Sequence, residues 1–94
     1  MKKSILQHNK ACYICGTTLN LQLHHVYYGT ANRKLSDIDG CVVWLCMYHH
    51  TGTAGAHLNY NVSLRLKQEM QKAWQEYYNK TTEDFIKRYG KNYL

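Results

Sequence analysis

Two short stretches set the architecture of this chain: Cys12-Tyr13-Ile14-Cys15-Gly16 and, further along, Cys46-Met47-Tyr48-His49. Each contains two potential metal ligands separated by two residues, a spacing that lets both side chains reach one ion from a tight turn. We therefore predict a tetrahedral Cys₃His site for a structural Zn²⁺. Its ligands would be Cys12, Cys15, Cys46 and His49. Two alternatives stay open: the cysteines are small buried residues without a metal, or Cys41 is the fourth ligand in place of His49.

The 94 residues carry 12 Lys and Arg against 6 Asp and Glu, a formal net charge of +6. A basic chain favours a polyanionic partner, either nucleic acid or an acidic membrane surface. We expect one domain over residues 1–94, with a zinc-containing core at about 10–60 and a helical part at about 61–94. The longest strongly apolar run, residues 41–47, is far below the roughly 20 residues that span a bilayer. We therefore expect no membrane span, no secretion and a cytoplasmic location.

Glycines and apolar runs divide the chain into an α+β pattern. Residues 21–28 and 41–45 are rich in branched and aromatic side chains and are predicted to be strands. The polar segment 30–39 between them is predicted to be a loop, which would join the strands as an antiparallel pair. A short helix is expected to begin near Met47 and to end at Gly52 or Gly55.

Two longer helices are expected in the C-terminal part. Apolar residues recur at helical spacing over residues 62–78, which predicts a helix with one apolar face. That face consists of Val62, Leu66, Met70, Ala73, Trp74 and Tyr77. A last helix is expected from residue 82 to Gly90, because acidic residues follow its start, basic residues precede its end and a glycine closes it. The expected N-caps are Asn61 and Thr82.

A second group of candidate residues consists of histidines. His24 and His25 adjoin in the first predicted strand, and His50 directly follows a predicted zinc ligand. Adjacent residues of a regular strand point to opposite faces, so both would reach one site only through a bulge or an irregular strand end. A site that cleaves phosphodiesters needs a cation to stabilise charge on the phosphate and a base to deprotonate water. Neutral imidazole serves either purpose, although a solvated strand end is the competing interpretation.

His57 lies seven residues after His50, about 10 Å along a straight helix, which is too far for both to bind one ion. Gly52 and Gly55 would break such a helix and let His57 fold back as a third metal ligand or a phosphate contact. The alternative is a loop histidine that faces water.

The ordered combination Cys12-x-x-Cys15, Leu23-His24-His25 and Val43-Trp44-Leu45-Cys46-x-x-His49-His50 resembles the HNH (ββα-metal, His-Me finger) endonuclease family. The resemblance covers roughly residues 12–57, and the C-terminal part is similar to small bacteriophage HNH proteins. It implies a ββα-metal core with a zinc knuckle, followed by C-terminal helices. By this resemblance His24 would bind the catalytic divalent cation, His25 would be the general base, and His50 would also hold the cation.

Two positions depart from the family pattern. Cys41 stands where the family has an Asn that tethers the loop, so either another group, for which we name Asp39, braces it or the bracing is lost. His49 stands where Cys is usual, which still leaves an ordinary Cys₃His zinc site.

The sequence thus predicts an endonuclease that hydrolyses phosphodiester bonds in DNA. The expected cofactors are a structural Zn²⁺ and a catalytic Mg²⁺ or Mn²⁺, with Ni²⁺ or Zn²⁺ as further candidates for the second site. DNA would be bound mostly through its phosphates, with Arg33, Lys34 and Tyr28 as candidate contacts. If the gene belongs to a phage, the location would be the bacterial host cell. The alternatives are a non-catalytic zinc-containing nucleic-acid-binding accessory protein and a structural zinc domain for protein interaction.

Overall fold

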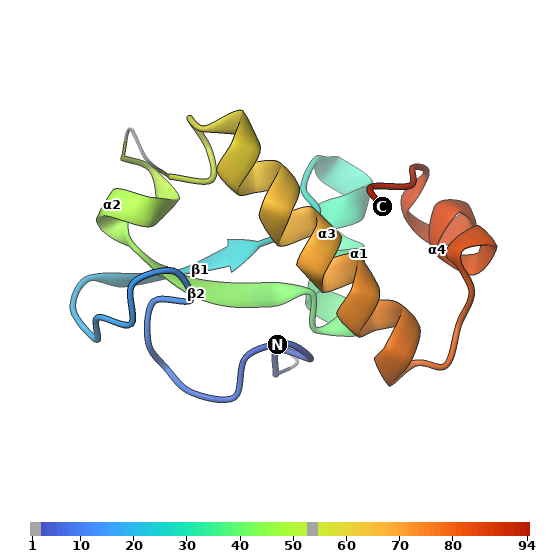
Figure 1. Ribbon diagram of the computed structural model, residues 1–94, viewed down its shortest axis with the longest axis horizontal. Coiled ribbons are helices and arrows are strands. Elements are labelled where there is room, and N and C mark those ends of the chain that lie inside the picture. The colour runs from blue at the N-terminus through green and yellow to red at the C-terminus, as the bar shows by residue number, and fades with distance from the viewer. Residues whose placement is uncertain (1–2, 53–54) are drawn as a thin grey trace.

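The computed structural model describes residues 3–52 and 55–94, and these form an α+β protein (Figure 1). Within the described residues, strands β1 (Leu21–His25) and β2 (Val42–Cys46) form a two-stranded antiparallel sheet, as predicted. The register runs without interruption from Leu21 opposite Cys46 to His25 opposite Val42. The helices are α1 (Thr30–Asp39), α2 (Met47–His50), α3 (Tyr60–Tyr77) and α4 (Thr82–Tyr89). None of the described helices is long and apolar enough to cross a membrane.

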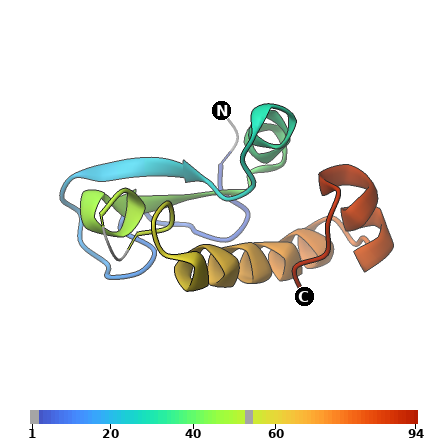
Figure 2. The same cartoon turned by 90° about the horizontal axis from the view of Figure 1, so that it is seen from above.

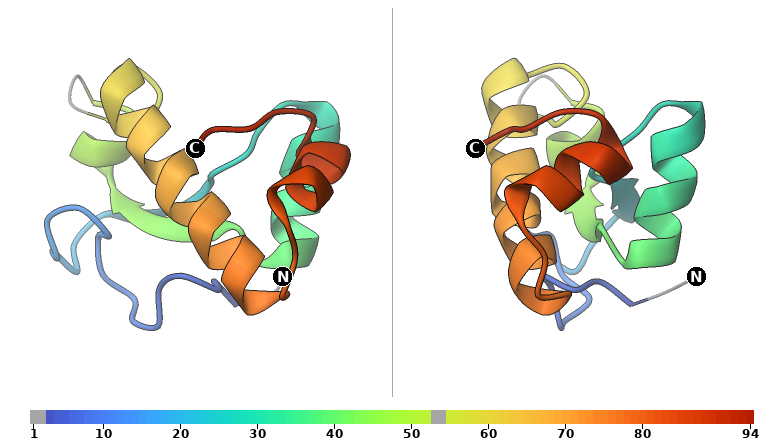
Figure 3. Two further views of the ribbon diagram at one scale, coloured as in Figure 1. Left: turned by 45° about the vertical axis from the view of Figure 1, so that its right-hand side comes forward. Right: turned by 90° about the vertical axis from the view of Figure 1, so that its right-hand side faces the viewer.

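The helices surround the two strands on several sides. Helices α1 and α3 lie on opposite sides of the strand pair (Figure 2), and α4 closes the end between them (Figure 3). Helix α2 lies at the other end, directly after β2 (Figure 1). The molecule therefore has one end built around α2 and a second end built where α1, α3 and α4 meet.

The predicted loop at residues 30–39 is wrong, because this segment forms α1. The helix follows Gly29, which has a φ of 93°, and ends at Gly40 in the left-handed conformation. Its buried residues are the polar Ser36 and Asp39, whereas the apolar residues that recur at helical spacing, Ala31, Leu35 and Ile38, are exposed or only half-buried. Ser36 Oγ accepts from the backbone N–H of Tyr27 at 3.2 Å and donates to its carbonyl at 2.7 Å. These hydrogen bonds fix α1 against the chain that leaves β1.

The other boundaries shift by a few residues. Strand β1 ends at His25 rather than at residue 28. Helix α3 begins earlier than predicted, with Asn59 as its N-cap, whose side chain accepts from the Val62 N–H. Helix α4 has Thr81 as its N-cap rather than Thr82, in a capping box with Asp84. In both helices the observed N-cap is a residue of the same type as the predicted one, one or two positions earlier in the chain.

The core lies between the strands, α3 and α4. Leu45, Met70 and Phe85 are fully buried, and the Trp74 ring packs edge-on against Phe85 with centroids 5.4 Å apart. The apolar face predicted for α3 is confirmed in Leu66, Met70 and Trp74. Tyr77, predicted for the same face, is 61% exposed. The neighbouring Tyr78 packs against the core at this end of α3 instead.

Asp39 connects three helices at the end remote from α2. Its buried carboxylate accepts hydrogen bonds from Trp74 Nε1 at 2.9 Å, from Tyr89 OH at 2.8 Å and from Arg88 Nε and Nη2 at 2.5 and 2.7 Å. Burial raises the pKa of Asp39, but the hydrogen bonds from Arg88, Tyr89 and Trp74 outweigh it and hold the pKa below the ordinary 3.8. Tyr78 OH also donates to the Asp39 carbonyl at 2.6 Å. Asp39 thus ties the end of α1 to α3 and α4. The loop that the sequence analysis expected it to brace is helical.

Candidate metal centres

The first candidate centre gathers the four predicted zinc ligands from three parts of the chain. The ligand atoms of Cys12, Cys15, Cys46 and His49 all lie within 4.8 Å of one another. Cys12 and Cys15 sit on a tight turn closed by a hydrogen bond from the Gly16 N–H to the Cys12 carbonyl, at 2.8 Å. Cys46 is the last residue of β2, and His49 lies in α2. The antiparallel pair and the turn thereby bring two distant Cys-x-x-Cys and Cys-x-x-His pairs together.

The spacing of these atoms fits a tetrahedral zinc ion. Cys15 Sγ and Cys46 Sγ are 3.8 Å apart, Cys46 Sγ and His49 Nδ1 are 3.3 Å apart, and Cys12 Sγ and His49 Nδ1 are 3.8 Å apart. Zn–S bonds of about 2.3 Å and Zn–N bonds of about 2.0–2.1 Å place tetrahedral ligands roughly 3.5–3.8 Å from each other. The donor set and its dimensions therefore suit a structural Zn²⁺.

The fourth cysteine belongs to another part of the fold. Cys41 precedes β2, is fully buried, and accepts a hydrogen bond from Tyr89 OH at 3.5 Å. It lies at the end of β2 opposite to Cys46, about 16–17 Å along an extended chain. The alternative in which Cys41 replaces His49 as a ligand is therefore wrong.

The electrostatic surroundings of Cys12 favour the thiolate that zinc requires. Burial raises the pKa of Cys12, but hydrogen bonds from the backbones of Cys15, Cys46 and Ile14 outweigh it and lower the pKa to about 6. A thiol with this pKa is largely ionised at neutral pH, before any metal contributes its own charge.

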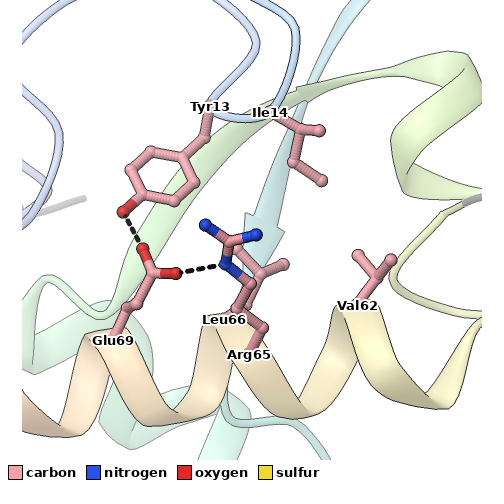
Figure 4. A pocket seen from close by; sticks show the side chains of 6 residues that line it. All are labelled: Tyr13, Ile14, Val62, Arg65, Leu66 and Glu69. Carbon is pink, nitrogen blue, oxygen red and sulfur yellow. Dashed lines mark hydrogen bonds and ion pairs between the residues drawn. The ribbon is translucent and has the colours of Figure 1, made fainter.

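The turn that carries Cys12 and Cys15 is also tied to α3 (Figure 4). Tyr13 OH donates to Glu69 Oε1 at 2.5 Å, and Arg65 Nε donates to the other carboxylate oxygen at 2.8 Å. Burial and then Glu69 raise the pKa of Tyr13 to about 12, so its hydroxyl remains a donor. A cavity of about 400 Å³ separates the turn from the helix. Its lining consists of Tyr13, Ile14, Val62, Arg65, Leu66 and Glu69.

The second candidate centre consists of histidines. The ligand atoms of His24, His50 and His57 lie within 4.8 Å of one another, and Nε2 of His50 is 3.0 Å from Nε2 of His57. His57 folds back as the sequence suggested, with its backbone N–H bonded to the His50 carbonyl at 3.2 Å. Gly55 permits this turn, because a Cβ there would lie 2.8 Å from the His50 backbone. One ion with bonds of about 2.1 Å would hold two nitrogens roughly 3.0–3.4 Å apart, so these three imidazoles also suit a metal.

The pKa values of His24 and His50 favour the neutral imidazole, which is the form that binds a metal. Burial, followed by the neighbouring His50 and His57, lowers the pKa of His24 to about 3, and burial followed by His57 lowers the pKa of His50. Both rings are therefore neutral near pH 7, as metal binding requires. The Nδ1–H of His50 donates to Gln22 Oε1 at 2.6 Å, which leaves the Nε2 lone pair directed at His57.

The sequence analysis did not predict Gln22 as a residue of the site. It stands two residues before His24 on the same face of β1, and this spacing was the signal available. An exposed glutamine at such a position has no chemistry of its own, so only the tertiary contact with His50 gives it a role.

His25 points away from the histidine centre. Since β1 is regular and has no bulge, His24 faces His50 and His57, whereas His25 Nε2 lies 3.3 Å from Asp37 Oδ1 on the α1 side. The bulge considered from the sequence is therefore not present in β1.

The three residues predicted to contact DNA lie on both sides of β1: two beside His25 and one beside the histidine centre. Arg33 and Lys34 line the same pocket as His25. Tyr28 lies instead beside His57, with ring centroids 5.9 Å apart, and Lys67 Nζ sits 4.5 Å from the centre of its ring. All three predicted contacts are exposed.

Comparisons with protein-family models, with curated proteins and with solved structures found no match for this chain. The chemical roles of the two centres therefore rest on the residues themselves.

Proposed function

We propose that this protein is a metal-dependent endonuclease that hydrolyses phosphodiester bonds in DNA. The observation that carries the proposal is the cluster of His24, His50 and His57, whose ligand atoms lie within 4.8 Å, next to His25 in the chain. Three protein ligands leave coordination positions for water or substrate, as in catalytic metal sites, whereas four ligands close a structural site. The net charge of +6 supports a polyanionic substrate.

The fold is compatible with the ββα-metal core that the sequence resembles. Strands β1 and β2 pair antiparallel, and α2 follows β2 directly. In the proposed enzyme, α1 is an additional helix between the two strands, and α3 and α4 extend the core beyond α2.

The donor set favours a transition metal in the histidine centre. Imidazole nitrogens suit Zn²⁺ and Ni²⁺ better than they suit Mg²⁺, which prefers oxygen ligands and retains its water. A divalent cation held by His24, His50 and His57 would stabilise the negative charge that develops on the phosphate during hydrolysis. We therefore rank Zn²⁺ and Ni²⁺ above the Mg²⁺ and Mn²⁺ expected from the sequence.

His25 would act as the general base. It accepts a proton from the water that attacks phosphorus, the bond from phosphorus to the leaving oxygen breaks, and that oxygen takes a proton from solvent. Because the outer edge of β1 pairs with no other described strand, a DNA backbone along this edge can reach both faces of the strand. His24 and His25 lie on opposite faces of β1, so they would act on one phosphate group only where the DNA backbone passes around this free edge of the strand. Arg33 and Lys34 would bind phosphates on the His25 side.

The test is cleavage of supercoiled plasmid by the purified protein in separate reactions with Zn²⁺, Ni²⁺, Mn²⁺ or Mg²⁺, read on an agarose gel. We expect relaxed or linear product from wild-type protein. His25→Ala should lower the rate by about 10²–10⁴-fold at every metal concentration, since an absent base cannot be replaced by more metal. His24→Ala should regain part of its activity in excess metal, because mass action offsets a missing ligand.

His8→Ala is the matched control, since His8 is exposed and outside both metal centres. It should cut like the wild type. Absence of cleavage with every cation, combined with a mobility shift of the DNA, would favour the non-catalytic DNA-binding alternative. Normal cleavage by both His24→Ala and His25→Ala would show that the nuclease site lies elsewhere.

A further inference from the structure

Helix α1 collects polar side chains around His25. Thr30, Arg33, Lys34 and Asp37 follow each other at intervals of three, one and three residues, which places them on one face of a helix. Together with His25 they line a pocket of about 350 Å³ on the side of β1 opposite to the histidine centre. This pocket exists only because residues 30–39 are helical, so it could not be foreseen from the predicted loop.

One residue that lines this pocket, Asp37, contacts the imidazole of His25. His25 Nε2 lies 3.3 Å from Asp37 Oδ1, and the His25 side chain is only 15% exposed. A carboxylate only accepts hydrogen bonds, so this contact favours the neutral tautomer with the proton on Nε2. That tautomer keeps a lone pair on Nδ1, the nitrogen that can then accept a proton from water.

The two basic residues that line the pocket, Arg33 and Lys34, do not pair with the Asp37 carboxylate in the described part of the chain. That carboxylate lies against the His25 imidazole instead. The carboxylate therefore remains available to the imidazole, while Arg33 and Lys34 remain exposed to a phosphate.

We propose that Asp37 is a positioning residue that holds His25 in the Nε2–H tautomer and fixes its ring for proton transfer at Nδ1. The inference rests on the proposed nuclease function, to which it adds a residue that acts through His25 rather than on the substrate. It resembles in logic the carboxylate that orients the histidine of a Ser-His-Asp triad, although no nucleophilic side chain is involved here.

Asp37 is suited to mutation because the fold does not depend on it. Its side chain is 45% exposed, and α1 is fixed by Ser36 and Asp39 instead. We would compare the wild type with Asp37→Ala, with Asp37→Glu, which can restore the carboxylate contact, and with His25→Ala. Glu76→Ala is the control, since it removes one exposed carboxylate from α3.

Two readouts separate positioning from a structural role. The ¹⁵N shifts of the His25 side chain should report the Nε2–H tautomer in the wild type and a mixture of tautomers in Asp37→Ala. Steady-state cleavage of an oligonucleotide duplex should show kcat reduced about 10–100-fold in Asp37→Ala, the range typical for a lost orienting partner. KM should stay equal or fall, since a negative charge near the phosphates has been removed, and Asp37→Glu should recover part of kcat. Glu76→Ala should match the wild type in both readouts.

The outcomes distinguish this inference from the proposed function. If wild-type protein cuts and His25→Ala does not, an Asp37→Ala variant with wild-type kcat or an unchanged tautomer would overturn the role of Asp37 alone. If wild-type protein cuts no DNA with any cation, the nuclease proposal fails, and the role of Asp37 in catalysis fails with it.

Discussion

The two candidate metal centres share the short helix α2 but differ in their chemistry. His49 and His50 are neighbours in the chain, and His49 belongs to the cysteine centre whereas His50 belongs to the histidine centre. Successive residues of a helix point about 100° apart, so one turn can supply ligands to two separate ions. The cysteine centre has four ligands, and the histidine centre has three. By the usual distinction, a metal in the first centre would be closed off and structural, while a metal in the second would retain open positions.

The net charges expected for the two centres with a metal bound support the same distinction. A Zn²⁺ bound by three thiolates and one neutral imidazole carries a net charge of +2 − 3 = −1, which repels phosphate. A divalent cation bound by three neutral imidazoles keeps its charge of +2 and attracts phosphate. In the proposed enzyme, ligand chemistry would thus give stability to one centre and anion binding to the other.

The largest effect should come from breaking the cysteine centre. Cys12→Ser should unfold most of the chain, because structural zinc contributes about 10–16 kcal/mol in small zinc domains while whole domains are stable by about 5–15 kcal/mol. Circular dichroism and zinc analysis of the purified variant would measure this. Cys41→Ala is the matched control: it removes a buried cysteine outside the centre and should keep both fold and zinc. A folded Cys12→Ser, or loss of zinc from Cys41→Ala, would contradict the assignment of the structural site.

A smaller effect is expected at the end of the molecule that depends on no metal. Asp39→Asn should lower the free energy of unfolding by about 3 kcal/mol, the lower part of the range for a buried pair, because Arg88 is partly exposed. The pKa of Asp39 is lowered in the folded state, so its contribution is complete above the ordinary pKa of 3.8 and is lost as pH falls through the folded pKa. Urea unfolding at pH 7 and below pH 4 would show the difference between wild type and variant shrinking in acid.

Glu76→Gln, which neutralises an exposed carboxylate on α3, is the control for that experiment and should leave stability unchanged at both pH values. Asp39→Asn should also retain its zinc. Release of zinc by Asp39→Asn would mean that the two ends of the molecule are not independent, and the comparison of metal-held and metal-free regions would have to be revised.

The smallest effect should separate the two centres from each other. Gln22→Ala removes the acceptor of the His50 Nδ1–H and should weaken cation binding at the histidine centre by about 10–100-fold. Gln22→Glu keeps an acceptor and should preserve the affinity. Calorimetric titration with Ni²⁺ would measure both variants. Equal affinity in wild type and Gln22→Ala would show that the contact does not orient His50, and a loss of structural zinc would show that the centres are coupled.

The sequence predicted the parts of the fold that have periodic or paired signals. Both strands, α3 and α4 were predicted from apolar patterning, and the cysteine centre from ligand spacing, because these are local properties. His24 and His50 were assigned to one site by the family resemblance, and His57 was left open between a metal ligand, a phosphate contact and a loop residue. Helix α1 was missed because the segment is polar overall, although Ala31, Leu35 and Ile38 recur at helical spacing. The residues that fix it, Ser36 and Asp39, find their partners at Tyr27 and on α3 and α4.

Two residues of the candidate sites also could not be predicted, because their partners are distant in the chain. Gln22 and Asp37 touch His50 and His25 across 28 and 12 positions of the chain, respectively. Neither residue type is distinctive, and the spacing of Gln22 and His24 indicates only a shared strand face, so the local sequence does not identify these contacts. The capping residues show the limit at its smallest scale, since Asn59 and Asn61 are equally good N-caps and only the packing of α3 selects Asn59.

The separation of the two centres is tested most directly by native mass spectrometry of wild-type protein and His50→Ala, titrated with Ni²⁺. Wild-type protein should carry one tightly held zinc and bind one further ion. His50→Ala should keep the zinc and lose the further ion, because His50 belongs to the histidine centre and its neighbour His49 to the cysteine centre. A wild-type protein that binds a single ion in total, or a His50→Ala variant that loses its tightly held zinc, would contradict the existence of two centres with different roles.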